Sequence, residues 1–342
     1  MNDPIPAWPG EPVALASGEV YVRSAPADGP AGAAGAQPAL FVHGLGGSAT
    51  NWTDLMELLR RPAAAGPCPP APALDGQAID LPGFGFSPVP ADGDYSVDAK
   101  ARAVTELIEH GHRWPVHLIG NSLGGAVCVR VAARRPDLVR TLTLISPALP
   151  DLRPRLLPLR VAAFCAPGVG RRAMRRLDRL PAEARTLGSV REVYLNPGLM
   201  HPSRYAEEAA EVRRRDGLGY TDEVLIGSAR GLVAEYLRPG PRSLWRDAAR
   251  VTVPTLVLYG SHDRLVSPLM AARAARAFAA PRVLVLPRMG HVAMMERPDL
   301  VAAEMRGLLA SVAGRRGRAN RTDFERGTPQ HAATPADAGG GG

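Results

Sequence analysis

The sequence predicts an α/β fold in which a mostly parallel β-sheet is flanked by helices. Two observations lead to this prediction: short runs of consecutive apolar residues recur along the chain, and segments with helical periodicity separate them. Strands that are apolar on both sides are typical of parallel sheets buried between two helix layers. The 342 residues suffice for one large domain with an insertion, or for two domains.

The individual elements follow in chain order. Two short apolar runs at 13–15 and 20–22, separated by a Ser-Gly turn, predict a β-hairpin near the start. Stretches rich in Ala, Gly and Pro at 25–38 and 61–73 predict loops. Further strands are expected at 39–42, 77–80, 116–119, 142–145, 255–259 and 283–286, and helices at 52–59, 96–112, 123–135, 270–280 and 300–312.

No strand is expected between residues 149 and 250. Apolar residues at helical spacing predict helices at 171–180 and 221–237, so this segment is interpreted as a cap over the strand ends. The predicted organisation is therefore a first core part at 1–148, a helical cap at 149–250 and a second core part at 251–313. The charged, Pro-containing segment 314–342 is expected to be a disordered basic tail.

The net charge of +8 is concentrated in two segments. Residues 151–185 contain nine arginines and three acids, and residues 314–342 contain five arginines and three acids. Neither stacking aromatics nor a known binding motif accompanies these charges, so nucleic acid is not an expected partner. The basic helix at 170–180 is either the solvated outer face of the cap or a weak peripheral contact for anionic lipid or an acidic substrate.

Several features predict a cytoplasmic protein. No apolar run approaches the roughly 20 residues of a membrane span, and the first residues lack a basic segment followed by an apolar one. The three cysteines, Cys68, Cys128 and Cys165, have no C-x-x-C spacing, which disfavours both a disulfide framework and a zinc site. The oligomeric state stays undetermined.

A G-x-S-x-G motif places a candidate nucleophile, Ser122, between a predicted strand and a predicted helix. A sharp turn of this kind lifts the serine hydroxyl clear of the sheet, and the small residues Gly120 and Gly124 let the backbone close. The N-terminus of the following helix favours developing negative charge. The motif therefore indicates nucleophilic catalysis.

A serine becomes an effective nucleophile when a base accepts its proton and an acid orients that base. Asp263 follows the strand expected at 255–259, and His291 follows the strand expected at 283–286. Because the carboxyl ends of parallel strands meet at one edge of a sheet, both are expected near Ser122. Asp151 and Asp299 are alternative acids, and the latter is better explained as the cap of the last helix.

Two other histidines and one glycine-rich motif have competing interpretations. His262 is an alternative base, but it adjoins the acid, whereas His43 is expected to shape a loop. Residues 44–49 fit G-x-G-x-x-A, the dinucleotide-binding fingerprint. The stretch 61–73 lacks the acid that this fingerprint requires about 20 residues later, so a nicotinamide cofactor is disfavoured.

Taken together, these motifs resemble the α/β-hydrolase fold family over about residues 40–313. The resemblance rests on His43-Gly44-Leu45-Gly46-Gly47, Asp80-Leu81-Pro82-Gly83-Phe84-Gly85, Gly120-Asn121-Ser122-Leu123-Gly124-Gly125, Gly260-Ser261-His262-Asp263 and Gly290-His291. The order Ser, Asp, His along the chain is the order of that family.

The resemblance implies an α/β-hydrolase fold whose helical cap is inserted after the sixth core strand. It also implies that Ser122 is the nucleophile, His291 the general base and Asp263 the orienting acid. The backbone N–H groups of Leu45 and Leu123 would form the oxyanion hole. No metal or organic cofactor is implied.

The expected function is hydrolysis of a small or lipid-like carboxylic ester through an acyl-enzyme. Alternatives are a thioesterase, a carbon–carbon hydrolase of ring-cleavage diketones, and a non-turnover receptor for a small ligand. The diketone hydrolases resemble this chain around the nucleophile, but they commonly carry Met at the position of Leu123 and Trp at the position of Val292. A serine nucleophile argues against haloalkane dehalogenases and epoxide hydrolases, which use an aspartate.

Overall fold

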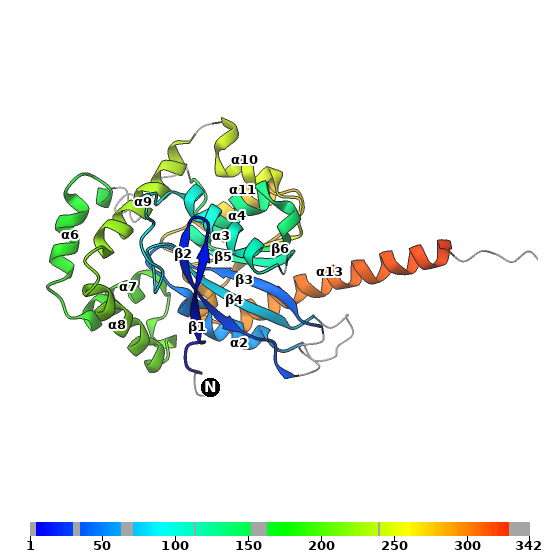
Figure 1. Cartoon of the computed structure of the whole chain (residues 1–342), viewed down its shortest axis with the longest axis horizontal. Helices are drawn as coiled ribbons and strands as arrows, with labels where there is room; N and C mark the ends of the chain where they lie inside the picture. Colours follow the sequence, from blue (N-terminus) through cyan, green and yellow to red (C-terminus); the bar gives the residue numbers. More distant parts are fainter. Residues whose placement is uncertain are drawn as a thin grey trace, which may run out of the picture.

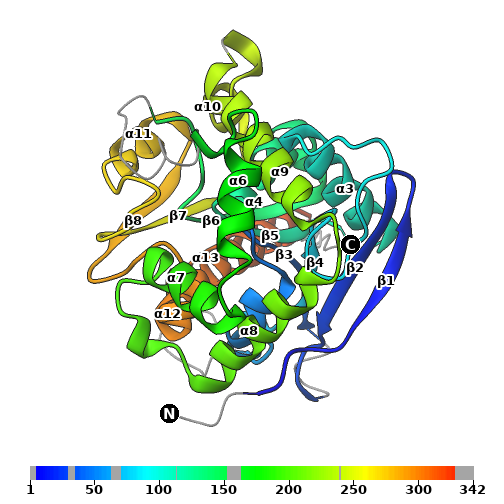
Figure 2. The same cartoon turned by 90° about the vertical axis from the view of Figure 1, so that its left-hand side faces the viewer.

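The computed structural model describes residues 5–29, 35–62, 71–112, 114–151, 163–238 and 240–327. One sheet of eight strands runs through the molecule in the order β1-β2-β4-β3-β5-β6-β7-β8 (Figures 1 and 2). Only the β1–β2 and β2–β4 pairs are antiparallel. The strands are β1 Gly10–Leu15, β2 Gly18–Ala25, β3 Gln37–Val42, β4 Leu74–Asp80, β5 Val116–Asn121, β6 Val139–Ile145, β7 Thr255–Gly260 and β8 Pro281–Leu286. The predicted α/β class, the hairpin and the mostly parallel sheet are confirmed.

Alternate residues of each central strand enter two different cores. On β3, Leu40 and Val42 face one core, and Ala39 and Phe41 face the other. The first core lies under α3 Val97–His110, α4 Leu123–Arg134, α10 Leu244–Arg250 and α11 Met270–Ala277. The second lies under α2 Thr53–Leu59, α12 Ala293–Glu296 and α13 Pro298–Gly327. Burial on both faces explains why these strands are runs of apolar residues.

Between β6 and β7 the described residues form helices and no strand. We call residues 163–238 the helical insertion; it contains α6 Val169–Leu177, α7 Ala182–Val193, η3 Pro197–Leu199, α8 Pro202–Asp216 and α9 Thr221–Leu237. These helices gather on one side of the molecule, and the far end of α13 points away from them (Figures 1 and 2).

Two predicted boundaries differ from the structure. The helix α10 packs against the core rather than with the insertion, because Leu244 and Ala248 are fully buried in the first core. The boundary expected at 250 therefore lies one helix too late. The last helix continues to Gly327, so residues 314–327 of the expected disordered tail are helical, since no proline interrupts the chain before Pro329. Residues 328–342 of that tail lie outside the described residues.

Among the described helices, none combines the length and the hydropathy that crossing a membrane requires. 

Glycines allow α4 to lie directly against β3. A Cβ atom on Gly124 would lie 2.2 Å from the carbonyl oxygen of Val42 and 2.5 Å from that of His43. A Cβ atom on Gly120 would lie 2.5 Å from the carbonyl oxygen of Gly124. Backbone carbonyls in a strand cannot move aside as the end of a flexible side chain can. Both glycines are therefore required by packing at the point where β5 turns into α4.

We expect Gly124→Ala to lower the free energy of unfolding by about 1–3 kcal/mol, the usual cost of overpacking a core. Gly111→Ala is the matched control, because the nearest atom to its added Cβ is 3.7 Å away and its φ of −70° suits alanine. The control should stay within about 0.5 kcal/mol of the wild type. Urea denaturation of both variants measures the difference. Equal stabilities would show that the contact between α4 and β3 can accommodate an added methyl group.

Candidate active site

Ser122 occupies a strained turn between β5 and α4. Its φ of 52° and ψ of −117° lie outside the regions that residues with a side chain normally adopt. Three backbone hydrogen bonds stabilise this conformation. The N–H of Ser122 donates to Ile145 at 3.1 Å, and its carbonyl accepts from Ala126 at 3.1 Å and from Ala148 at 2.9 Å. The turn leaves the side chain half-exposed, and Ser122 lines the large pocket described below.

Asp263 and His291 form a buried pair at the ends of β7 and β8. The Nδ1 atom of His291 lies 2.9 Å from Oδ2 of Asp263, and the two residues are 3% and 2% exposed. The other oxygen of Asp263 accepts the N–H groups of Leu265 at 2.8 Å and Val266 at 2.9 Å. Burial acts to raise the pKa of Asp263, but the charge and hydrogen bond of His291 and the N–H of Val266 outweigh it and lower that pKa below its ordinary value. The acid is therefore ionised at neutral pH.

The main chain of His291 is fixed from two sides. Its carbonyl accepts from the side-chain amide of Asn121 at 3.2 Å, and that amide also donates to Ile145 at 3.0 Å. Its N–H donates to the carbonyl of Val193, the last residue of α7, at 2.7 Å. The neighbour of Ser122 on β5 thus positions the histidine, and so does the helical insertion.

Glu296 reinforces this connection. Its buried carboxylate accepts the N–H of Gly290 at 2.7 Å and the N–H of Leu195 at 3.1 Å, and so joins the loop of His291 to the segment after α7. Sequence analysis gave no role to Asn121 or to Glu296. The signal for the latter is weak: it is a single acid that ends the apolar run 292–295, just before the last helix.

The glycine-rich loop after β3 approaches the nucleophile closely. A Cβ atom on Gly44 would lie 3.1 Å from the Cβ of Ser122, and Leu45 lines the same pocket. Leu123 is the first residue of α4, so its N–H has no acceptor within the helix. The backbone N–H groups expected to bind an oxyanion therefore belong to two segments that meet at Ser122.

His43 shapes this loop, as the sequence suggested. Its Nδ1 lies 2.7 Å from the carbonyl oxygen of Gly44, and its Nε2 accepts the N–H of Leu81 at 3.0 Å. Burial outweighs the hydrogen bond to Gly44 and lowers the pKa of His43 to about 4. The ring is therefore neutral at pH 7, and its two hydrogen bonds define one tautomer.

Asp80 and Arg215 attach two further segments to the same loop. Asp80 accepts the N–H of Ala49 at 2.6 Å and the N–H of Phe86 at 2.9 Å, and burial raises its pKa to about 6 in spite of these bonds. Arg215 of α8 donates to the carbonyl oxygen of Gly46 at 3.0 Å. The insertion thus contacts the glycine-rich loop after β3 as well as the loop of His291.

The competing candidates lie in other surroundings. Asp299 is paired with Arg297 at 2.6 Å on the surface. The ring of His262 is bonded to Ser261 at 2.8 Å in an exposed position. Asp151 lines the same pocket as His291. Of the three candidate acids, Asp263 is the one for which the structure gives a hydrogen bond to His291.

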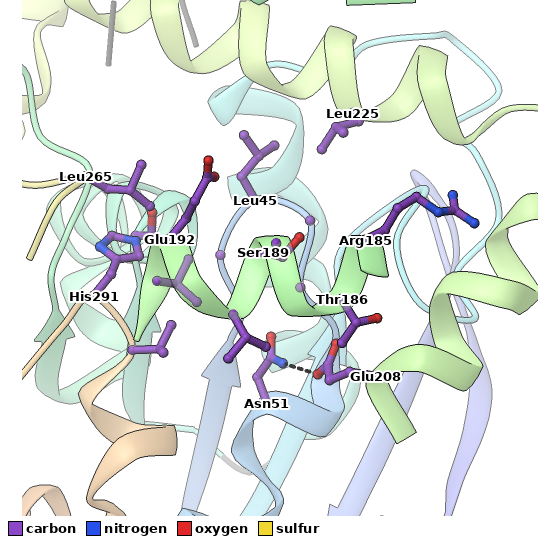
Figure 3. A pocket seen from close by; sticks show the side chains of 18 of the residues that line it. Leu45, Asn51, Arg185, Thr186, Ser189, Glu192, Glu208, Leu225, Leu265 and His291 are labelled. Atoms are coloured by element: carbon purple, nitrogen blue, oxygen red, sulfur yellow. Dashed lines mark hydrogen bonds between the residues drawn. The ribbon is translucent and has the colours of Figure 1, made fainter. Parts of the chain in front are cut away.

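A pocket of about 1290 Å³ lies between the sheet edge and the helical insertion. Its size exceeds the range of roughly 300–1,000 Å³ that is usual for small-molecule sites. In Figure 3, Ser189 and Glu192 of α7 form one wall, Leu225 of α9 faces them, and His291 lies toward one end. Asn51 donates to Glu208 of α8 at 3.0 Å near the base of this wall (Figure 3).

Comparisons with known proteins agree with this architecture. Residues 38–298 match the sequence model of a family described as alpha/beta hydrolase fold. The chain is 25% identical over 269 residues to Lipase 3 of Moraxella sp. (strain TA144), a match that covers 76% of this chain and 73% of the lipase. Other matched relatives are also named as lipases or esterases.

Two more matches differ in their named activity. The chain is 28% identical over 280 residues to the dihydrolipoyllysine-residue acetyltransferase component of the acetoin cleaving system of Pseudomonas putida. The match covers 81% of this chain. The chain spans only 65% of the length of that relative. The solved structure of 2-hydroxy-6-oxo-6-phenylhexa-2,4-dienoate hydrolase from Rhodococcus sp. strain RHA1 superposes with a TM-score of 0.66 at 19% identity, covering 88% of this chain and 99% of the other.

We expect Asp263→Asn to lower kcat by at least about 10²-fold, because the corresponding change in a serine-protease triad costs about 10⁴-fold. The amide keeps the size of the carboxylate, but it can donate a hydrogen bond and cannot support a charged imidazole. Asp151→Asn is the matched control in the same pocket and should cost far less. Steady-state kinetics of both variants on one p-nitrophenyl ester measure the difference. If kcat falls strongly in Asp151→Asn and stays close to the wild-type value in Asp263→Asn, the assignment of the acid is reversed.

Proposed function

The chain belongs to the α/β-hydrolase fold family, and on that premise we propose that it is a serine hydrolase that cleaves uncharged carboxylic esters through an acyl-enzyme. The observation that carries this proposal is the buried hydrogen bond between His291 and Asp263 in a pocket that Ser122 also lines. The lipases and esterases among the relatives support ester hydrolysis as the reaction.

In the first half of the reaction, Oγ of Ser122 attacks the ester carbonyl carbon while Nε2 of His291 accepts the hydroxyl proton. Asp263 stabilises the imidazolium that forms. The negative charge moves to the carbonyl oxygen, which the N–H groups of Leu45 and Leu123 bind. Each such donor typically contributes about 2.7–4 kcal/mol of transition-state stabilisation. Collapse of the tetrahedral intermediate breaks the bond to the alcohol, which leaves with the proton of His291.

The second half repeats these steps with water. His291 accepts a proton from the water molecule as its oxygen attacks the acyl carbon. The oxyanion forms again at the same two N–H groups, and its collapse releases the carboxylic acid and returns the proton to Ser122.

The charges of the pocket favour an uncharged substrate. Six carboxylates and two guanidinium groups line it among the described residues: Asp151, Asp178, Glu192, Glu208, Asp216, Asp222, Arg185 and Arg215. Burial raises the pKa of Glu208, yet the acids outnumber the bases even with that residue neutral. Arg185 forms ion pairs with Asp216 and Asp178, and Arg215 lies 3.5 Å from Glu211. Both arginines are therefore already in contact with carboxylates, which weakens their attraction for a substrate carboxylate.

This lining weighs against the carbon–carbon hydrolase interpretation. The substrate named for the structurally similar Rhodococcus enzyme is a dienoate, which is an anion. An anion that enters this pocket would face a net excess of negative charge. At an effective dielectric constant of about 20, one like charge at about 8 Å costs on the order of 2 kcal/mol.

We further propose that the protein works in the cytoplasm. Cys128 is buried and Cys165 half-buried, and both are free thiols in the structure. Burial raises the pKa of both thiols, which keeps them protonated. Cys68 lies outside the described residues. A reducing compartment suits such a set of cysteines.

A matched pair of esters tests the function and the charge preference together. In p-nitrophenyl hexanoate and p-nitrophenyl hydrogen adipate the carbon number is the same, but the second ends in a carboxylate. We expect kcat/KM to be at least about tenfold higher for the hexanoate, with a gap that narrows at high salt. Equal or faster hydrolysis of the adipate would contradict the charge argument. Faster cleavage of a ring-cleavage dienoate than of either ester would favour the carbon–carbon hydrolase, and binding without turnover would favour a receptor.

A further inference from the structure

We propose that α6 is a docking surface for a bilayer containing anionic lipid, and that it brings the mouth of the pocket to that bilayer. The α6 surface consists of Arg171, Arg172, Arg175 and Arg176 together with two exposed apolar residues, Val169 at the start of the helix and Leu180 just beyond its end. This inference goes beyond the proposed ester hydrolysis and does not depend on it, because binding to a bilayer can be measured without substrate.

The four arginines form one face of the helix. Their spacing places them together on one side, whereas Gly170 and Met174 on the other side are buried. A Cβ atom on Gly170 would lie 2.9 Å from the side chain of Ile226, so the small residue lets α6 pack closely against α9. The apolar side of α6 therefore faces the insertion, and the arginines face outward.

These arginines differ from Arg185 and Arg204 of the insertion because they form no ion pair with a described carboxylate. Within the described part of the chain, no carboxylate oxygen lies within ion-pair distance of any of the four, and all four are exposed. By contrast, Arg185 of α7 forms ion pairs with two aspartates, and Arg204 of α8 pairs with Asp54 at 2.6 Å. No acid occurs within α6. The helix thus presents exposed arginines that form no ion pair among the described residues, and Arg175 interacts with Asp222 at longer range.

Exposed apolar side chains lie beside this charge. Val169 and Leu180 are 48% and 47% exposed. Leu180 also lines the pocket, as does Leu177 on the opposite side of α6 from the arginines, so the apolar rim is continuous with the interior of the pocket. Arginine guanidinium groups bind phosphate oxygens, and an adjacent apolar side chain can enter the boundary between headgroups and acyl chains. The positive charge and the apolar rim together complement the surface of an anionic bilayer.

The position of α6 gives the docking a consequence for the pocket. The helix lies at the outer side of the insertion, and the end of α13, the other basic segment, points away from it (Figures 1 and 2). A flat bilayer bound by α6 would therefore contact the insertion and not the end of α13. An ester dissolved in that bilayer would meet the apolar rim of the pocket first. The excess of negative charge inside the pocket would at the same time disfavour entry of the anionic lipids themselves.

Co-sedimentation of the full chain with lipid vesicles tests this proposal. Vesicles of phosphatidylcholine alone are compared with vesicles in which phosphatidylglycerol replaces a third of the lipid, at low and at high salt. We expect binding to the anionic vesicles that salt weakens. Replacing all four α6 arginines with glutamine should weaken that binding by at least about tenfold, since each basic residue near an anionic surface contributes to attraction.

A matched control has the same change in net charge elsewhere. Arg242, Arg246, Arg276 and Arg288 are exposed residues of other segments, and their replacement with glutamine should leave vesicle binding within about twofold of the wild type. Hydrolysis of a water-soluble p-nitrophenyl ester should be equal in both quadruple variants, which verifies that they are folded and separates this proposal from the ester chemistry.

Three results would overturn the docking surface. One is the absence of wild-type binding to anionic vesicles. Another is equal loss of binding in the α6 variant and the control, which would show that net charge alone acts. The third is displacement of the chain from vesicles by single-stranded RNA that binds the same four arginines. The partner would then be a nucleic acid.

Discussion

The whole site depends on the strained turn at Ser122, where β5 ends and α4 begins. A positive φ at a serine is unfavourable, and three backbone hydrogen bonds to β6 and its following loop and to α4 maintain it. The turn is possible because Gly120 and Gly124 let three backbone segments approach one another within distances that no side chain would allow. The glycine-rich loop after β3, the first turn of α4 and the loop of His291 all make contacts in this one region.

The helical insertion belongs to the site as well as covering it. Val193 accepts the N–H of His291, Glu296 joins the histidine loop to the segment after α7, and Arg215 donates to the carbonyl of Gly46 in the glycine-rich loop. The insertion is therefore hydrogen-bonded to the main chain of both loops of the candidate site. Its outer helix, α6, packs against α9 and carries four exposed arginines. The inner helices thus position the candidate catalytic residues, and the outer helix, α6, is the part available to a partner.

Sequence patterns predicted the central strands and the three candidate catalytic residues because each depends on local chemistry. Consecutive apolar residues identify a strand buried on both faces, and Ser122, Asp263 and His291 each follow such a strand directly. The helix α8 was not predicted, because its buried residues are Arg204 and Ala209, which leave no apolar stripe. Glu296 and Arg215 act through contacts with residues far along the chain, and no local pattern encodes those contacts. The boundary at α10 was misplaced for the same reason: a short amphipathic helix does not reveal which core it packs against.

Reaction of the native protein with a fluorophosphonate, followed by peptide mapping of the adduct, tests the central claim most directly. If the strained turn presents an activated serine, a single adduct forms on Ser122, and Ser122→Ala loses labelling while its thermal unfolding stays unchanged. Labelling that persists in the folded Ser122→Ala variant, or an adduct on another residue of the wild type, would contradict the account.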